Sequence, residues 1–264
     1  MVERVQVGAA DAACSRGDEH LTRPRGRVVD LVDDKCSVAH DRRPHAREVI
    51  GRAPTLSEVK WIEVGDGAVL DDVVTAVCGT LRRGGCVVLP TDTVYGMTCG
   101  ITHHKAIRRI YRLKDMDPKK PLSILVGDMS MVGHYARGVS TPAFRLLKRV
   151  LPGPYTFIFE ASPEVPKIML RKRRTVGIRM PDNPIALALL AEMGEPLLSS
   201  SIRGPEQDFV NDPEELDTSL GKDVEMVIDG GILLPVPSTV VDLSGAEPVL
   251  LREGKGDVGI LELF

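Results

Sequence analysis

Short apolar segments alternate with amphipathic ones from Glu58 onward, and this alternation limits the fold more than any other feature. The stretch LDDVVTAVCGTLRRGG places its apolar residues at helical spacing over 70–81, and Gly84 and Gly85 end the predicted helix. The apolar run CVVLP follows and predicts a strand. KAIRRIYRLK then predicts a second helix, and PLSILV a second strand.

Six further segments have the apolar and β-branched composition of strands. They are YTFIFEA, TVGIRM, EPLLSSS, VEMVID, STVVDL and PVLLRE. A predicted helix, STPAFRLLKRV, precedes the first of them, and another, NPIALALLAEM, lies between the second and the third. No helix is predicted between the last three strands. Interleaved helices and strands indicate an α/β domain, and the missing helices favour a mixed sheet over a purely parallel one.

Residues 1–57 lack this alternation. Their polar stretches, RGDEHLTRPRGR and HDRRPHAREVIGRAP, show no sustained periodicity, so we predict a largely disordered extension before one folded domain, 58–264. The arginines are typical of organellar transit peptides, but such peptides avoid the acidic residues that recur here. We therefore expect a cytoplasmic protein, with a plastid or a mitochondrion as the alternative.

Composition excludes several classes of protein. The net charge of -3 rules out a protein-wide basic field, so any site for a nucleotide or RNA must be local. The five cysteines include no CxxC pair, which argues against a zinc site and favours a reducing compartment. No apolar run reaches the roughly 18 residues that a membrane span needs, so no membrane partner is expected. There is also no P-loop, no GxGxxG and no Ser or Cys nucleophile motif.

The strand predicted within VVLPTDTVYGMTCG, residues 87–100, stops at a proline and is followed by Thr91, Asp92, Thr93 and Tyr95. In one interpretation these hydroxyls only satisfy the backbone of a loop. In the other they line a ligand pocket, because ligands of α/β sheets bind in the crevice beyond the strand ends. The hydroxyls alone do not decide between the two.

Polar residues recur at the ends of other predicted strands. They are Arg179, Ser199 to Ser201 with Arg203, Ser238 with Thr239, and Arg252. A single arginine at a strand end usually reaches solvent, but several such clusters indicate one shared site. Because arginine binds carboxylate or phosphate as a fork, this site should take an anion together with a small polar molecule.

Two basic runs are further candidates for a phosphate or RNA contact. RKRR spans Arg171 to Arg174, and LKDMDPKKP carries Lys114, Lys119 and Lys120 on a predicted loop. A solvated surface is the ordinary interpretation of such runs, and binding to an RNA backbone or a phosphate is the alternative.

Six motifs together resemble the YrdC-like family in content and order: LPTDTVYGM, LPGPYTFIF, TVGIRMPDNP, PLLSSS, PSTVVDL and LLREGKGD. The resemblance covers about Val59 to Leu263 and implies a twisted, mixed, mostly parallel sheet with flanking helices around an open, positively charged cavity. Synthases of this family join ATP, bicarbonate and L-threonine into threonylcarbamoyl-adenylate and release pyrophosphate, for a modified adenosine of tRNA. The resemblance thus implies a nucleotidyltransferase, and family members have also been linked to double-stranded RNA binding.

The resemblance also assigns site residues. It implies L-threonine contacts for Thr91, Thr93, Ser201 and Ser238, a threonine carboxylate contact for Arg179, and nucleotide contacts for Lys114, Thr175 and Arg252. Lys120 lies on the same predicted loop as Lys114, and Arg203 carries a long, charged side chain, so we expect nucleotide contacts for these two as well. Lys114 and Arg179 would supply catalytic charge. ATP would be a substrate with Mg²⁺ on its phosphates, and no metal site of the protein's own is predicted.

Two positions depart from the synthase pattern. The synthases have arginine where this chain has Met116, and asparagine where it has Arg203, so the chain is more similar to the YciO-like branch. Losing one charge-assisted contact costs roughly 1.5–3 kcal/mol, or roughly one to two decades in affinity or rate. A weak synthase and a non-catalytic protein that binds a nucleotide or double-stranded RNA are both compatible with the sequence.

A chain that begins at Glu58 should be as stable as the whole chain, because the preceding residues lack the pattern of a packed segment. Its melting temperature, followed by circular dichroism, should lie within a few degrees of that of the whole chain. Loss of soluble expression on truncation would contradict this prediction.

Overall fold

The computed structural model describes part of the chain, within one compact unit of Met1–Gly8 and Pro54–Phe264. The described residues are 4–6, 59–64, 71–113, 122–170, 174–203, 208–216 and 224–263. The rest of the predicted extension 1–57 lies outside them, as do Lys114, Met116, Lys119, Lys120 and residues 171–173. The sequence-based expectations for these residues therefore stay predictions.

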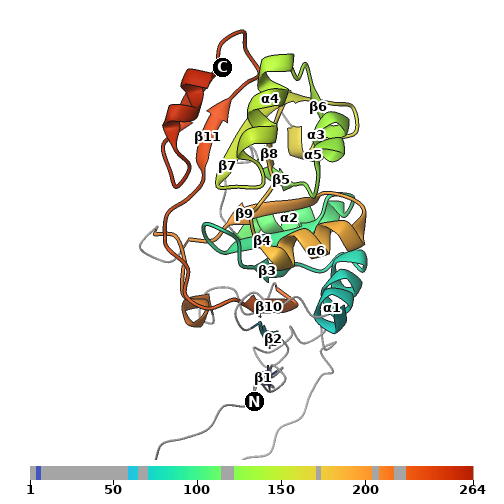
Figure 1. Ribbon diagram of the computed structural model, residues 1–264. Coiled ribbons are helices and arrows are strands. Elements are labelled where there is room, and N and C mark those ends of the chain that lie inside the picture. Colours follow the sequence, from blue (N-terminus) through green and yellow to red (C-terminus); the bar gives the residue numbers. More distant parts are fainter. Residues whose placement is uncertain are drawn as a thin grey trace, which may run out of the picture. The chain divides into compact units, whose positions relative to one another are not determined.

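The described residues form one twelve-stranded mixed sheet (Figure 1). Its strands are β1 (Arg4–Gln6), β2 (Lys60–Glu63), β3 (Val87–Leu89), β4 (Gly96–Gly100), β5 (Ser123–Leu125), β6 (Ala136–Arg137), β7 (Tyr155–Ala161), β8 (Thr175–Arg179), β9 (Leu197–Ser201), β10 (Met226–Asp229), β11 (Thr239–Asp242) and β12 (Val249–Arg252). The order is β1-β2-β10-β3-β4-β9-β5-β8-β7-β11-β12, with β6 beside β7. No strand was expected within residues 1–57, yet β1 pairs in parallel with β2.

The predicted α/β fold with a mixed sheet and flanking helices is confirmed. Antiparallel pairs are more frequent than the resemblance implied: within the described strands six pairings are antiparallel and five are parallel. The reason is that β3–β4 and β11–β12 are joined without a helix, and β9 lies antiparallel between β4 and β5. Short connections between neighbouring strands require antiparallel pairing.

Six α-helices accompany the described strands: α1 (Asp71–Arg82), α2 (His104–Leu113), α3 (Met129–Tyr135), α4 (Thr141–Val150), α5 (Lys167–Leu170) and α6 (Pro184–Met193). Two short 3₁₀ helices, η3 (Pro213–Leu216) and η4 (Val258–Leu263), complete them. Ser140 caps α4 and Asn183 caps α6, each accepting a backbone N–H with its side-chain oxygen. None of the helices in these ranges is long and apolar enough to cross a membrane.

The two faces of the sheet carry separate apolar clusters. The first contains Ile124, Ile178 and Leu198 together with buried residues of α2 and α4. The second contains Leu125 and Leu197 together with buried residues of α1 and α6. Because successive residues of a strand point to opposite faces, the two clusters lie on opposite faces of the sheet.

Small and polar residues continue the second face beside the cluster under α1 and α6. Ser199, Ser123 and Gly177 are in register on β9, β5 and β8, so they form one row on that face. Arg179 lies two residues beyond Gly177 and is in register with Leu125. The sheet thus places a buried arginine on the same face as this row of small residues, one row further along the strands.

Gly177→Ala should destabilise the protein by about 1–3 kcal/mol through overpacking, because a Cβ there would lie 2.8 Å from Ser123 Oγ. Adding Ser123→Ala should recover part of the loss. Gly133→Ala in α3 is the control: a Cβ there meets nothing within 4 Å, so it should stabilise by roughly 0.5–1 kcal/mol. Equal free energies of unfolding for the two single variants in urea would refute the packing argument.

Candidate functional site

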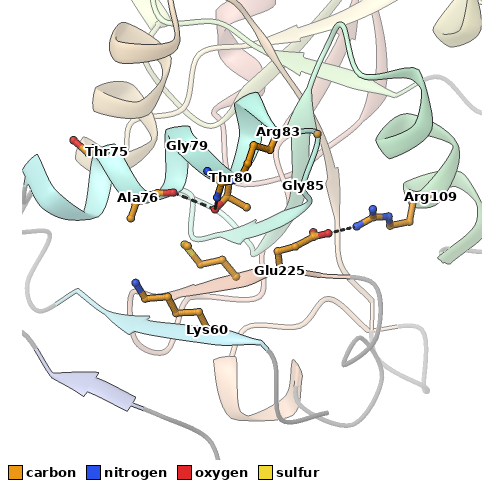
Figure 2. A pocket seen from close by; sticks show the side chains of 11 residues that line it. Lys60, Thr75, Ala76, Gly79, Thr80, Arg83, Gly85, Arg109 and Glu225 are labelled. Carbon is orange, nitrogen blue, oxygen red and sulfur yellow. Dashed lines mark hydrogen bonds and ion pairs between the residues drawn. The ribbon is translucent and has the colours of Figure 1, made fainter. Parts of the chain in front are cut away.

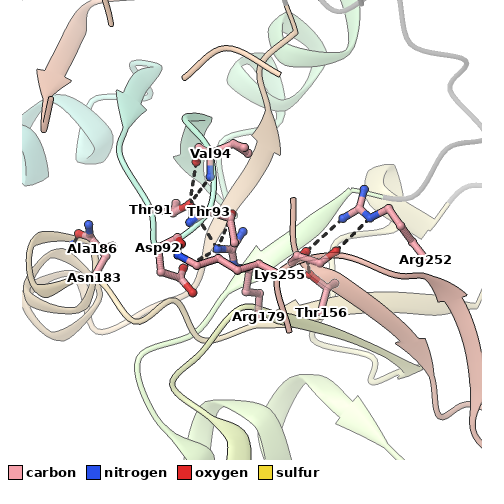
Figure 3. A network of polar contacts seen from close by, with 11 residues as sticks. Thr91, Asp92, Thr93, Val94, Thr156, Arg179, Asn183, Ala186, Arg252 and Lys255 are labelled. Carbon is pink, nitrogen blue, oxygen red and sulfur yellow. Dashed lines mark hydrogen bonds and ion pairs between the residues drawn. The ribbon is translucent and has the colours of Figure 1, made fainter. Parts of the chain in front are cut away.

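The loop between β3 and β4 binds Arg179 at the end of β8 (Figure 3). Nη2 of Arg179 donates to Asp92 Oδ1 at 2.5 Å, to Thr93 Oγ1 at 2.8 Å and to Thr91 Oγ1 at 3.3 Å. Thr91 Oγ1 also donates to the Val94 carbonyl at 2.7 Å and accepts from the Val94 N–H at 3.2 Å. The hydroxyls therefore close the loop, as the first interpretation predicted, and they also hold an arginine; the ligand pocket of the second interpretation stays a prediction.

The Arg179–Asp92 ion pair is buried, with each side chain 8% exposed. Burial lowers the pKa of the Arg179 guanidinium, and the charge of Asp92 offsets part of that effect. Because arginine stays protonated in proteins, Arg179 keeps its positive charge within the pair. Asp92 Oδ2 and Arg179 Nε have no hydrogen-bond partner among the described residues.

A second polar group lies at β7, β11 and β12 and is centred on Ser238. Its Oγ is 2.9 Å from Thr156 Oγ1, and both are buried. Arg252 donates from Nε to the Ser238 carbonyl at 3.0 Å and from Nη2 to Ser238 Oγ at 3.1 Å. Ser238 therefore fixes the direction in which the Arg252 side chain runs.

Strand register brings the two groups to the same face of the sheet. Val240 pairs with Arg252 on one side and with Thr156 on the other. Since Phe157 pairs with Ile178, the preceding Thr156 lies beside Arg179 across β7 and β8. Side chains of paired residues point to the same face, so Arg252 and Arg179 share it.

Three arginines concentrate positive charge here. Burial lowers the pKa of Arg252, and the charges of Arg203 and Arg179 lower it further. The guanidinium of Arg203 lies 4.3 Å from the centre of the Phe209 ring, in a cation–π contact. The positive charges of these arginines repel one another, and a bound anion would relieve that repulsion.

The segment after β12 reaches the β3–β4 loop. Lys255 donates from Nζ to the backbone carbonyl of Asp92 at 2.5 Å, and its side chain extends across the site toward that loop (Figure 3). Tyr95 fixes the other end of the loop: its hydroxyl donates to the Gly231 carbonyl at 2.7 Å and accepts from Gly230 N–H at 3.0 Å. Burial raises the pKa of Tyr95, so this hydroxyl stays protonated.

The structure brings together only some of the predicted site residues. Thr91, Thr93 and Arg179 are in direct contact, and Ser238 is in contact with Arg252. Thr175 and Ser201 lie on the same face as Arg179, but Thr175 is four residues, or about 13 Å, from it along β8. Lys114 and Lys120 lie outside the described residues.

Asp92, Thr156 and Lys255 belong to the site and were not assigned to it from the sequence. Asp92 stood in the hydroxyl cluster, but nothing there indicated that it pairs with Arg179. Thr156 occupies an apolar strand, where only strand register places it beside Arg179. Lys255 lies in EGKGD, which the sequence suggested to be a turn. All three depend on contacts between residues far apart in the chain, which sequence spacing does not reveal.

A separate cavity of about 750 Å³ contains none of these residues (Figure 2). It lies between α1, β2 and β10, and its charged lining residues are Lys60, Arg83, Arg109 and Glu225. Glu225 is used structurally, since it pairs with Arg109 at 2.6 Å and accepts from the Cys86 N–H at 2.6 Å. Nor do the described residues gather three His, Cys, Asp or Glu side chains that could hold a metal ion. The arginine-rich face is therefore the candidate functional site of this α/β protein.

Comparison with known proteins identifies the family to which this chain belongs. A family model for Sua5, YciO and YrdC proteins, described as telomere recombination, matches residues 79–254. Uncharacterized protein YciO of Escherichia coli K12 is 43% identical over 180 residues, which are 67% of this chain and 87% of that protein. Its crystal structure superposes with a TM-score of 0.73 at 38% identity, over 77% of this chain and 99% of that one. The chain belongs to the Sua5/YciO/YrdC family.

Threonylcarbamoyl-AMP synthases are also relatives. The enzyme of Pyrococcus abyssi is 31% identical over 182 residues, which cover 69% of this chain and 54% of that protein. The structure of P. abyssi Sua5 complexed with L-threonine superposes with a TM-score of 0.69 at 30% identity, over 74% of this chain and 57% of that one. The family thus contains named synthases as well as the uncharacterized YciO.

Arg179→Met should lower the free energy of unfolding by about 3–5 kcal/mol, because it leaves the Asp92 carboxylate buried without its partner. Arg252→Met is the matched control and should cost about 1 kcal/mol or less, because it breaks hydrogen bonds but leaves no buried charge unpaired. Urea unfolding of both variants measures the difference. Equal losses would show that the ion pair is not special to stability.

Proposed function

We propose that this protein is an ATP-dependent L-threonylcarbamoyladenylate synthase, a nucleotidyltransferase whose product serves tRNA modification. The observation that supports this most is the sheet face on which Arg179 and Arg252 are each held by hydroxyl groups. Such a face offers fixed cations for a carboxylate and for phosphates beside hydroxyls for a small polar molecule. Named synthases among the relatives, and the L-threonine complex of one Sua5, support L-threonine as the small polar substrate.

The proposed reaction needs no protein nucleophile. The α-ammonium of threonine first loses a proton to solvent. The neutral amine then takes up bicarbonate with loss of water, which gives a carbamate. A carbamate oxygen then attacks the α-phosphorus of ATP, the bond to the β-phosphate bridging oxygen breaks, and pyrophosphate leaves. Positioning and neutralisation of developing phosphate charge are what the protein has to supply.

Each part of the face has a proposed task. Arg179 binds the threonine carboxylate, with Thr91, Thr93 and Ser238 beside it as hydroxyl contacts. Arg252 and Arg203 face the nucleotide phosphates. Lys114, Lys120, Thr175 and Ser201 complete the set: the two lysines on the phosphates, Thr175 near the nucleotide and Ser201 near threonine. Mg²⁺ is expected to arrive on the ATP phosphates as part of the substrate.

Pyrophosphate release that depends on both L-threonine and bicarbonate tests the proposal, with the adenylate identified by mass spectrometry. ATP binding with no release of pyrophosphate would refute it. That result would favour the alternative, a YciO-like protein that binds a nucleotide or double-stranded RNA without catalysis. Its support is the higher identity to YciO and the two departures at Met116 and Arg203.

Arg203 offers a way to measure how far the departures compensate one another. It lies near enough to Arg252 to lower the pKa of that residue, so it adds a positive charge to this face. Met116, which replaces an arginine of the synthase pattern, adds no charge. Arg203→Ala should therefore weaken ATP binding by roughly tenfold. Arg82→Ala is the control: Arg82 pairs with Glu192 between α1 and α6 and should leave the affinity unchanged.

Calorimetry of ATP binding checks this prediction, and an unchanged affinity in Arg203→Ala would remove the compensation argument. Restoring the synthase pattern with Met116→Arg and Arg203→Asn should raise threonine-dependent pyrophosphate release by about tenfold or more. No gain in the double variant would mean that these positions do not limit the rate.

A further inference from the structure

The Arg179–Asp92 pair leaves hydrogen-bonding capacity unused on both partners. An arginine and a carboxylate usually meet as a fork, with two nitrogens facing two oxygens. Here a single nitrogen, Nη2, contacts a single oxygen, Oδ1, and the same nitrogen also serves Thr91 and Thr93. Asp92 Oδ2 and Arg179 Nε remain without a partner among the described residues, although both are buried. Buried polar atoms in native proteins are nearly always hydrogen-bonded, so these two point to a ligand.

The two atoms have complementary requirements. Arg179 Nε is a charged donor and suits an anionic oxygen, whereas Asp92 Oδ2 is an acceptor and suits a cationic donor. An α-amino acid carries a carboxylate and an ammonium on the same carbon. One such molecule can therefore satisfy both atoms of a single ion pair, which an anion alone cannot do.

An ammonium group already contacts Asp92. Lys255 is exposed and places Nζ on the backbone carbonyl of this residue at 2.5 Å (Figure 3). The contact shows that the surroundings of Asp92 accommodate a primary ammonium despite the nearby arginines. Because a lysine side chain on the surface is flexible, it can leave when another ammonium arrives.

We propose that Asp92 is the residue that binds the α-ammonium of the amino-acid substrate, while Arg179 binds its carboxylate, and that the incoming ammonium displaces Lys255. This inference rests on the proposed function for the identity of the amino acid as threonine. Asp92 acts as a binding residue that orients the amine next to the hydroxyl cluster. The proposal requires that the buried Oδ2 become accessible to the incoming ammonium.

Calorimetry without ATP tests the inference with two ligands. One is L-threonine, and the other is its hydroxy-acid analogue, in which a hydroxyl replaces the α-ammonium. The wild type should bind L-threonine at least about tenfold more tightly than the analogue. In Asp92→Asn, which keeps the shape of the side chain and one acceptor for Arg179, this preference should disappear. Asp72→Asn on α1 is the control and should keep it.

The outcomes separate this inference from the proposed function. A preference for the ammonium that persists in Asp92→Asn would overturn the inference, as would equal binding of the two ligands by the wild type. ATP affinity and the melting temperature show whether Asp92→Asn is folded. If it is not folded, the binding of the two ligands by the wild type and by Lys255→Met tests the inference instead. Lys255→Met should bind L-threonine a few-fold more tightly, and weaker binding would contradict displacement. Ammonium-dependent binding of another α-amino acid in place of threonine would refute the proposed substrate while supporting Asp92.

Discussion

The buried ion pair between Arg179 and Asp92 is the interaction on which the candidate site depends. Removing two charges from water costs several kcal/mol for each ion, and good geometry with additional hydrogen bonds has to offset that cost. The threonine hydroxyls of the β3–β4 loop provide those bonds, and Lys255 adds a contact from the segment after β12. The loop, the end of β8 and the C-terminal segment are thereby held together around a single guanidinium.

The sheet decides which polar groups can join that guanidinium. Thr156 and Arg252 come to the same face as Arg179 because β7, β8, β11 and β12 are in a particular register. A shift of one residue in any of these strands would turn its side chains to the opposite face, into the apolar cluster under α2 and α4. Two of the antiparallel pairs, β7–β8 and β11–β12, are part of this arrangement, and the parallel pair of β11 with β7 joins them.

The arginines give the site its electrostatic character. Burial lowers the pKa of Arg252, and repulsion by Arg203 and Arg179 lowers it further. The cation–π contact of Arg203 with Phe209 stabilises one of the arginines without neutralising it. A face that stores unfavourable positive charge binds anions more tightly than an isolated arginine does. This property serves a synthase and a nucleotide-binding protein alike, which is why the chemistry has to be tested by turnover.

The sequence by itself determined the fold class, the family and the residue types of the site. Periodicity reports whether a segment is a helix or a strand, and motif order reports the family, because both are local in the chain. Antiparallel placement of β9, the pairing of Asp92 with Arg179, and the positions of Thr156 and Lys255 were decided only by the tertiary structure. These contacts join residues separated by tens to more than a hundred positions, and their geometry follows from strand register and packing, which no local pattern encodes.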